Sequence, residues 1–313
     1  MNKSVAWNAN AWLLSAMMLA GWLVGTGGTG AAEEPSISKG LSNPFFAMNF
    51  EHLDPHISSS RPTQVRLLKE LGYDGALYLG GLDGMRDALG VLNEAGLEAY
   101  AVAVIPYDIP VDPGGACPAV LKEAIPQLKG RKSLLLIQFQ SKTYPRSSPD
   151  GDRRAVELGR ELADFARGYG VRVAIYPHHN IWCERVDHAI RLAKQCDREN
   201  LGLCFNLSHW LWTDPDGDLQ SLVRQAMPHL FLVTINGTSP QGSLETLDRG
   251  DYDVSAFLKP FIEAGYRGPI GLQCVSIKGD ARDNLARSMQ AWRKISARLA
   301  IGASALQVPK AKQ

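Results

Sequence analysis

Two histidines, His178 and His209, are the side chains of this sequence best suited to moving protons. His178 stands in the segment YPHHN and His209 in FNLSHW, and each segment directly follows an apolar run. A neutral imidazole titrates near pH 7, so it can take a proton from a substrate and return it. We predict that His209 and His178 are catalytic residues of one site.

His179 is adjacent to His178, and the two imidazoles could bind a metal or move protons together. Successive side chains on an extended segment point to opposite faces, however, so both should not reach one point. Two interpretations stay open: a functional pair, or one histidine in the site and the other packed or solvated. His179 is therefore a candidate for contact with substrate.

Uncharged polar and aromatic side chains near the ends of the same runs could bind a sugar. A carboxamide offers both a donor and an acceptor, which is what a sugar hydroxyl requires. Tryptophans such as Trp210 and Trp212 could stack on a sugar ring, although aromatic residues at such places more often lie in the core. The further candidates for substrate contact are Tyr176, Asn206, Trp210, Asn236 and Gln273.

Few ionisable side chains accompany these residues. Lys278 could stabilise a developing oxyanion, although a lone lysine on a surface loop is usually only solvated. Glu51, with His52 beside it, and Glu184 could act as acid or base, but Glu51 could equally pair with an arginine and Glu184 could stabilise a helix N-terminus. Lys278 and Glu51 complete the set of candidate catalytic residues.

These side chains follow apolar runs that alternate with helical patterns. Runs such as LLLIQF and LFLVTI have the continuous hydrophobicity of strands buried on both faces. Eight strand-then-helix units predict a single-domain α/β fold, a (β/α)8 TIM barrel over residues 43–300, with its site at the carboxyl ends of the strands. The expected strands are 45–50, 75–79, 98–104, 133–139, 171–176, 201–206, 230–235 and 269–274. The expected helices are 62–71, 85–95, 119–128, 153–169, 185–196, 219–227, 254–264 and 281–299.

Residues 1–32 have the composition of an export signal. Lys3 is followed by an apolar stretch over 11–24 and by small residues at 29–31. The stretch is shorter than the roughly 20 residues that span a bilayer, so export to the periplasm or the medium is favoured over an uncleaved anchor. No stable membrane span is expected once the signal is removed, and residues 301–313 are expected to be a flexible tail.

The composition excludes several classes of protein. The net charge is +1, from 33 basic and 32 acidic residues without a run of like sign, so nucleic acid is not an expected partner. An apolar fraction of 45% supports an ordinary globular core. The five cysteines leave at least one unpaired, and we interpret them as small core residues rather than a disulfide framework.

The order of the elements, with the segments YPHH, FNLSHW and GLQCVSIKGDAR, resembles the xylose-isomerase-like barrels over residues 43–298. That superfamily contains sugar isomerases, sugar epimerases, 3-keto-sugar lyases and endonuclease IV. The resemblance implies a TIM barrel whose partner is a small carbohydrate. The endonuclease branch fits poorly, because it requires several metal ions and a basic surface.

The resemblance also implies a divalent metal, held in the superfamily by Glu, Asp, His and Glu at the ends of strands five to eight. The matching positions here are Tyr176, Asn206, Thr234 and Gln273. Neutral oxygen donors in place of three anions should weaken binding of a magnesium or manganese ion severely. We therefore expect a subgroup without the usual metal, and no other cofactor.

Three functions stay open for this sequence. The first is a metal-independent sugar isomerase, epimerase or keto-sugar lyase, with His209 or His178 as the base and Lys278, Asn206 and Asn236 holding the oxyanion. The second is a non-catalytic carbohydrate-binding barrel. The third is a metal-dependent epimerase or 3-keto-sugar lyase that uses both histidines with unusual ligands such as Glu51.

Overall fold

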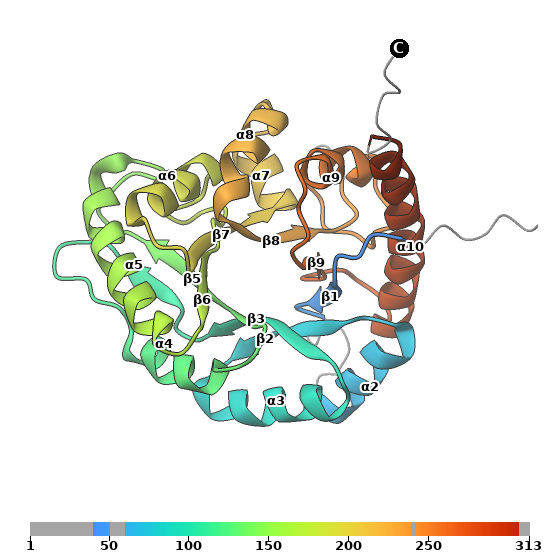
Figure 1. Cartoon of the computed structure of the whole chain (residues 1–313), viewed down its shortest axis with the longest axis horizontal. Coiled ribbons are helices and arrows are strands. Elements are labelled where there is room, and N and C mark those ends of the chain that lie inside the picture. The colour runs from blue at the N-terminus through green and yellow to red at the C-terminus, as the bar shows by residue number, and fades with distance from the viewer. Residues whose placement is uncertain (1–39, 51–59, 240–241, 307–313) are drawn as a thin grey trace, which may run out of the picture. The chain divides into compact units, whose positions relative to one another are not determined.

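Parallel strands close into a barrel in this chain, and helices surround it. The computed structural model describes residues 40–50, 60–239 and 242–306, which belong to the compact unit Ser38–Gln313. The predicted export signal at 1–32 and the candidates Glu51 and His52 lie outside the described residues. Figure 1, viewed nearly along the barrel, shows the strands around the centre and the helices outside them.

The strands run in the order β1-β2-β3-β5-β6-β7-β8-β9, and pairing of β9 with β1 closes the ring. This confirms the predicted (β/α)8 TIM barrel in one domain. Each of the eight strands in the ring begins and ends within two residues of its predicted run. The strands are β1 (Phe45–Met48), β2 (Gly75–Gly80), β3 (Glu98–Val104), β4 (Asp108–Pro110), β5 (Leu134–Gln140), β6 (Arg172–Ile175), β7 (Leu201–Asn206), β8 (Leu230–Ile235) and β9 (Ile270–Gln273).

Strand β4 is an addition to the predicted set. It lies outside the ring, because β3 pairs directly with β5 at Ala101 and Leu134. Instead, β4 pairs in parallel with the carboxyl end of β5, where Asp108 is in register with Gln138. Three residues are too few to give a hydrophobic period, so the sequence did not predict this strand.

The helices cover the outside of the barrel in the predicted order, with one addition, α7, directly after β7. The last helix, α10, extends five residues beyond Ile301, where we expected a flexible tail to begin. Its final residues are therefore helical. The helices are α2 (Arg61–Leu71), α3 (Leu82–Glu94), α4 (Ala119–Ala124), α5 (Asp152–Arg167), α6 (Val186–Cys196), α7 (Leu207–Thr213), α8 (Leu219–Ala226), α9 (Val254–Glu263) and α10 (Ala281–Leu306).

The core has two layers because neighbouring side chains on a strand point to opposite faces. In β1, Phe46 and Met48 fill the barrel interior, while Phe45 packs outward and stacks on Trp292 of α10 at 4.3 Å between ring centroids. Gly271 of β9 faces the interior as well, and a Cβ there would lie 2.6 Å from Met48 Sδ. A larger residue at this position would collide with the packed interior.

Two sequence expectations about the rest of the chain can be compared with the structure. All five cysteines lie among the described residues and are free thiols, four of them buried. In the described part of the chain, no helix combines the length and hydrophobicity needed to cross a bilayer.

Candidate active site

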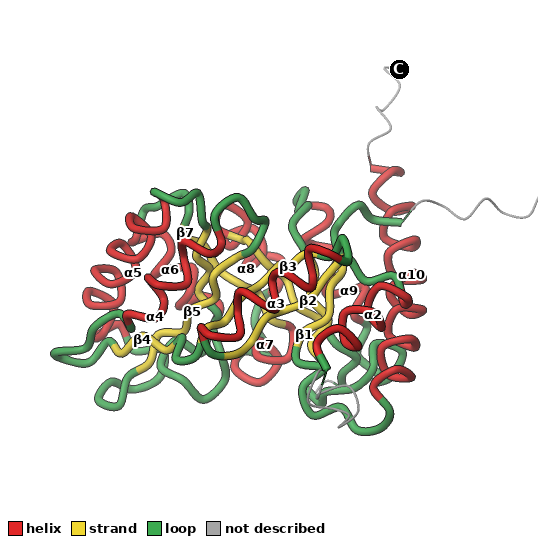
Figure 2. The backbone as a smooth tube through the Cα atoms, turned by 90° about the horizontal axis from the view of Figure 1, so that it is seen from below, coloured by secondary structure: helices red, strands yellow, loops and turns green. Residues whose placement is uncertain are grey.

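A cavity of about 360 Å³ opens at the carboxyl ends of the strands. Figure 2, a view across the barrel, shows β4 and the short helix α7 toward this end. Among the described residues, none of the side chains that line the cavity is an acid, a lysine or an arginine. They are Asn49, Leu79, Tyr107, Tyr176, His178, Asn206, Ser208, His209, Trp212, Leu244, Gln273 and Val275.

Five of the predicted site residues come together in this cavity: Tyr176, His178, Asn206, His209 and Gln273. They follow or end strands β6, β7 and β9, whose carboxyl ends meet at one end of a parallel barrel.

Two further candidates lie directly beside the cavity. Asn236 is fully buried behind it and accepts a hydrogen bond from Ser208 Oγ at 2.7 Å. Its amide nitrogen donates to Gly237 O and Ser243 O, so Asn236 supports the lining rather than holding a substrate oxyanion. The His179 ring lies 5.3 Å from the Trp212 ring, at the edge of the cavity.

Three candidates do not reach the cavity. Trp210 is only 4% exposed and packs against Phe205 and Phe257 in the core, so the tryptophan that lines the cavity is Trp212. Lys278 is exposed on the loop after β9 and is not part of the lining. Glu184 accepts from Asn180 N at 3.4 Å and pairs with an arginine outside the cavity.

The carboxamide of Asn206 is the centre of a hydrogen-bond network at the cavity floor. Its nitrogen donates to Tyr176 Oη at 3.1 Å and to Thr234 Oγ1 at 2.6 Å. Its oxygen accepts from the backbone N–H of His209 at 2.9 Å and so caps the N-terminus of α7. The donors and the acceptor of this side chain are therefore committed within the protein, and Asn206 does not hold an oxyanion.

Gln273 and Tyr176 extend the network across the floor. Gln273 Nε2 donates to Tyr176 Oη at 3.4 Å, and Gln273 Oε1 accepts from Asn49 Nδ2 at 2.9 Å. Two amide nitrogens thus donate to the Tyr176 hydroxyl, which leaves its own hydrogen to be donated. Burial raises the pKa of Tyr176 well above its ordinary value, so that hydrogen is retained.

The rings of His178 and His209 lie against each other, with centroids 3.9 Å apart and planes tilted by 46°. His178 Nδ1 lies 2.7 Å from the carbonyl oxygen of His179. A carbonyl only accepts, so this Nδ1 carries the hydrogen and the neutral ring has its lone pair on Nε2. His209 has the opposite tautomer, because its Nδ1 accepts from His179 N–H at 3.4 Å and its hydrogen is left on Nε2.

Burial keeps both rings uncharged. It lowers the pKa of His178, and it lowers the pKa of His209 to about 2, with the neighbouring His178 and His179 adding to the second shift. His178 therefore offers a basic nitrogen at neutral pH, and His209 offers an N–H donor that does not titrate in the physiological range.

Asp108 on β4 is a charged residue near this pair that the sequence did not indicate. Burial raises the pKa of its carboxyl group, a hydrogen bond from Gln140 opposes that shift, and its charge raises the pKa of His178. Its Oδ1 atom is buried without a hydrogen-bond partner. Only β4 brings this carboxylate toward the cavity, so no sequence period could have found it.

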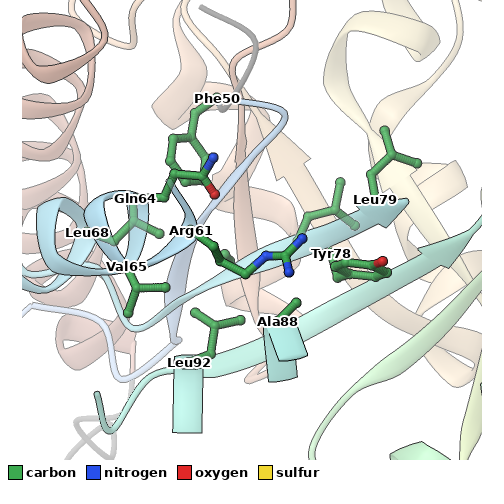
Figure 3. A pocket seen from close by; sticks show the side chains of 11 residues that line it. Phe50, Arg61, Gln64, Val65, Leu68, Tyr78, Leu79, Ala88 and Leu92 are labelled. Carbon is green, nitrogen blue, oxygen red and sulfur yellow. The ribbon is translucent and has the colours of Figure 1, made fainter. Parts of the chain in front are cut away.

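A second, smaller cavity of about 210 Å³ lies between β2 and helices α2 and α3 (Figure 3). Arg61 extends across it toward Tyr78, with 5.8 Å between the guanidinium carbon and the ring centroid. The guanidinium also donates to Asp87 Oδ2 at 2.7 Å and to Gly84 O at 3.2 Å. This cation is already paired, so the cavity offers no free charge for a ligand.

The side chains at the four strand ends do not fit the metal that the resemblance implies. A magnesium-like ion takes several oxygen ligands, usually with carboxylates among them. Tyr176, Asn206, Thr234 and Gln273 are neutral, and both carboxamide oxygens already accept hydrogen bonds. Among the described residues, no group of three or more His, Cys, Asp or Glu side chains could hold a metal ion.

The closed barrel, with a polar cavity at its carboxyl ends, defines a (β/α)8 TIM-barrel protein. The family model of the xylose isomerase-like TIM barrel matches residues 130–295, and the chain belongs to this family.

Solved structures share this fold, and a curated protein is similar in sequence to part of the chain. L-ribulose 3-epimerase superposes with a TM-score of 0.69 at 13% identity, covering 86% of this chain and 100% of that one. The apo form of 3-keto-D-glucoside 4-epimerase, YcjR, from E. coli has a TM-score of 0.64 at 17% identity, covering 80% of this chain and 99% of that one. The 3-dehydroshikimate dehydratase of Pseudomonas aeruginosa is 28% identical over 127 residues, which are 36% of this chain and 19% of that protein. The match thus spans about a fifth of that relative.

Because Asn206 is both a helix cap and part of a network, its substitution should lower the free energy of unfolding more than substitution of a residue that is only a helix cap. Asn206→Ala removes the cap of α7, worth about 1 kcal/mol, and leaves buried hydroxyl groups without their donor, worth about 1–3 kcal/mol more. Asp218→Ala removes only a cap, that of α8, at an exposed site. Denaturant unfolding should give the larger loss of unfolding free energy for Asn206→Ala. Equal losses would mean that the network adds nothing to the cap.

The charge of Asp108 predicts a measurable change at His178. Asp108→Asn should lower the pKa of the His178 imidazole further, because the carboxylate favours its protonated form. The pKa can be followed by NMR titration of the ring. Asp150→Asn, at an exposed carboxylate that contacts Ser148, is the control and should leave it unchanged. An unaltered pKa in Asp108→Asn would show that the two groups do not interact.

Proposed function

We propose that this protein binds a carbohydrate in the cavity at the barrel mouth and moves a proton at a carbon next to a sugar carbonyl. Isomerisation, epimerisation and elimination all begin with this step. The observation that carries the proposal is the pair of neutral imidazoles, one with a free lone pair and the other with an N–H donor. The epimerases of similar fold support the class of reaction.

The proposed step uses groups of this chain alone. His178 Nε2 accepts the proton as the C–H bond breaks, and the electron pair moves onto the carbonyl oxygen to give an enediolate. The His209 Nε2–H and the Tyr176 hydroxyl donate to that oxygen. Return of this proton to the neighbouring carbon, with the hydroxyl hydrogen passing between the two enediolate oxygens, gives the isomer. Return to the other face of the same carbon, after the enediolate turns in the cavity, gives the epimer. Lys278, exposed outside the cavity, has no part in this step.

A non-catalytic carbohydrate-binding barrel is the second candidate. The neutral lining of amides, hydroxyls and one tryptophan favours it, because such groups bind polyols without any chemistry. Whichever of the two functions it has, we propose that the protein is exported, because residues 1–32 have the composition of an export signal.

Substitution of His178 distinguishes the catalytic function from the non-catalytic binding function. His178→Gln should reduce proton transfer about 10²–10⁴-fold, because a general base is lost, while sugar affinity changes little. The measurement is loss of sugar C–H signals by NMR in D₂O, over a panel of aldoses, ketoses and 3-keto-glycosides. His229→Gln, at a histidine before β8 and thus at the opposite end of the barrel, is the control. Binding of panel sugars without exchange in the unaltered protein would favour the binding protein.

The pH dependence of the same exchange follows from the state of His178. The neutral ring is the active form, and burial holds its pKa below the ordinary value of 6.5. The rate should therefore be constant near neutral pH and fall only on the acid side, with an apparent pKa below 6.5. His209, whose pKa is lowered to about 2, should contribute no step in this range.

We also propose that the reaction does not require the divalent metal of the family. Dialysis against EDTA should leave the exchange rate unchanged, and added manganese or magnesium should not raise it. Elemental analysis of the purified protein is the independent measurement. Stoichiometric manganese, zinc or cobalt, with loss of exchange on chelation, would refute this proposal and restore the metal-dependent alternative, in which residues beyond the four strand ends serve as ligands.

A further inference from the structure

In the part of the chain that the structure describes, the lining of the cavity carries no formal charge. Its polar members are amides, hydroxyls and two imidazoles that burial keeps neutral. A phosphate or carboxylate group entering this space would lose its hydration without meeting a cation, and burial of an unpaired anion costs several kcal/mol.

TIM barrels usually hold a phosphate at a helix N-terminus, and in this chain the helices after β8 and β9 each begin with a capping aspartate. Such sites use the loops after the seventh and eighth barrel strands together with a helix N-terminus. After β8, the N-terminus of α9 is capped by Asp253, whose Oδ1 accepts from Ser255 N at 2.9 Å. After β9, Asp280 Oδ1 accepts from Asp283 N at 2.8 Å at the start of α10. Each carboxylate takes backbone donors that a phosphate would need.

Two charged groups of the described residues, Arg61 and Asp108, also disfavour an anion. Arg61 lines the neighbouring cavity (Figure 3). Its guanidinium already donates to Asp87 Oδ2 and Gly84 O. Asp108 places a carboxylate near His178, where its charge would repel a second negative group.

The size and the apolar wall of the cavity suit a single sugar ring. Its volume of about 360 Å³ lies near the lower end of the range of about 300–1,000 Å³ for small-molecule sites. Leu79, Leu244 and Val275 contribute an apolar side, and Trp212 adds an aromatic ring. A pyranose has such a division between C–H faces and hydroxyl edges.

We infer that the ligand of this cavity is an uncharged carbohydrate of one sugar ring, and that sugar phosphates and sugar acids are excluded. The inference rests on the proposed function and names the substrate class of the same site. It follows from the uncharged lining and from the two aspartates that cap the helices after β8 and β9.

Binding of matched sugars to the full chain tests the inference. The probes are D-fructose with fructose 6-phosphate, and D-glucose with glucose 6-phosphate and glucuronate, measured by calorimetry or saturation-transfer NMR. At least one neutral sugar should bind, and its charged counterparts should bind at least ten-fold more weakly. A phosphate or acid that binds as well as its neutral partner would overturn the inference, and so would a panel in which nothing binds.

A charge introduced at the rim tests the cause of the exclusion. Val275 lines the cavity and is 38% exposed, so a longer side chain can be placed there without disturbing the core. Val275→Lys should raise the affinity for the sugar phosphate several-fold, while Val275→Gln, the uncharged control, should not. Equal affinities in the two variants would show that charge is not what excludes the phosphate.

The outcomes distinguish this inference from the proposed function. If neutral sugars bind but no proton exchange occurs, the proposed reaction is refuted, while the inferred class of ligand is still supported. If proton exchange occurs on a sugar phosphate, the proposed reaction is supported, while the inference that the ligand is uncharged is refuted.

Discussion

The carboxamide of Asn206 is the group on which the geometry of the site depends. Its oxygen caps α7 at His209 N, and its nitrogen donates to Tyr176 Oη and Thr234 Oγ1. One side chain thereby fixes the helix that carries His209 and joins hydroxyl groups from the ends of β6 and β8. A carboxamide combines acceptor and donor groups in one plane, whereas a carboxylate only accepts and a hydroxyl has a single hydrogen. Asparagine therefore donates to both hydroxyl oxygens without a charge, whereas the isosteric aspartate would accept from those hydroxyls and bury a negative charge.

Absence of charge is what allows this network to lie almost entirely out of contact with solvent. Asn206 is 1% exposed, Thr234 0% and Gln273 5%. A carboxylate at such depth needs a compensating cation, because burial of an unpaired ion costs several kcal/mol. Neutral groups that hydrogen-bond to one another avoid this cost, and each bond is stronger in the low dielectric of the interior. The same burial keeps His178 and His209 neutral, so the network and the state of the histidines have one physical cause.

The sequence predicted the eight barrel strands because their apolar runs are buried on both faces, and it predicted the five cavity residues because parallel strands end on one side. It did not predict α7, whose seven residues are too few for a helical period. Trp210 and Trp212 are two residues apart on this helix and therefore point to different faces. Trp210 packs on Phe205, while Trp212 lines the cavity. Asp108 was missed for the related reason that β4 is only three residues long.

The backbone of His179 sets the proton positions on the imidazoles of His178 and His209 in the cavity. Its carbonyl accepts from His178 Nδ1, and its N–H donates to His209 Nδ1. A single residue at the exit of β6 thus gives the two facing rings opposite tautomers, with a lone pair on one Nε2 and a hydrogen on the other. The ring of His179 itself lies beside Trp212, with 5.3 Å between ring centroids. The pair acquires a donor and an acceptor from backbone geometry alone, and no charged group is needed to tell the two histidines apart.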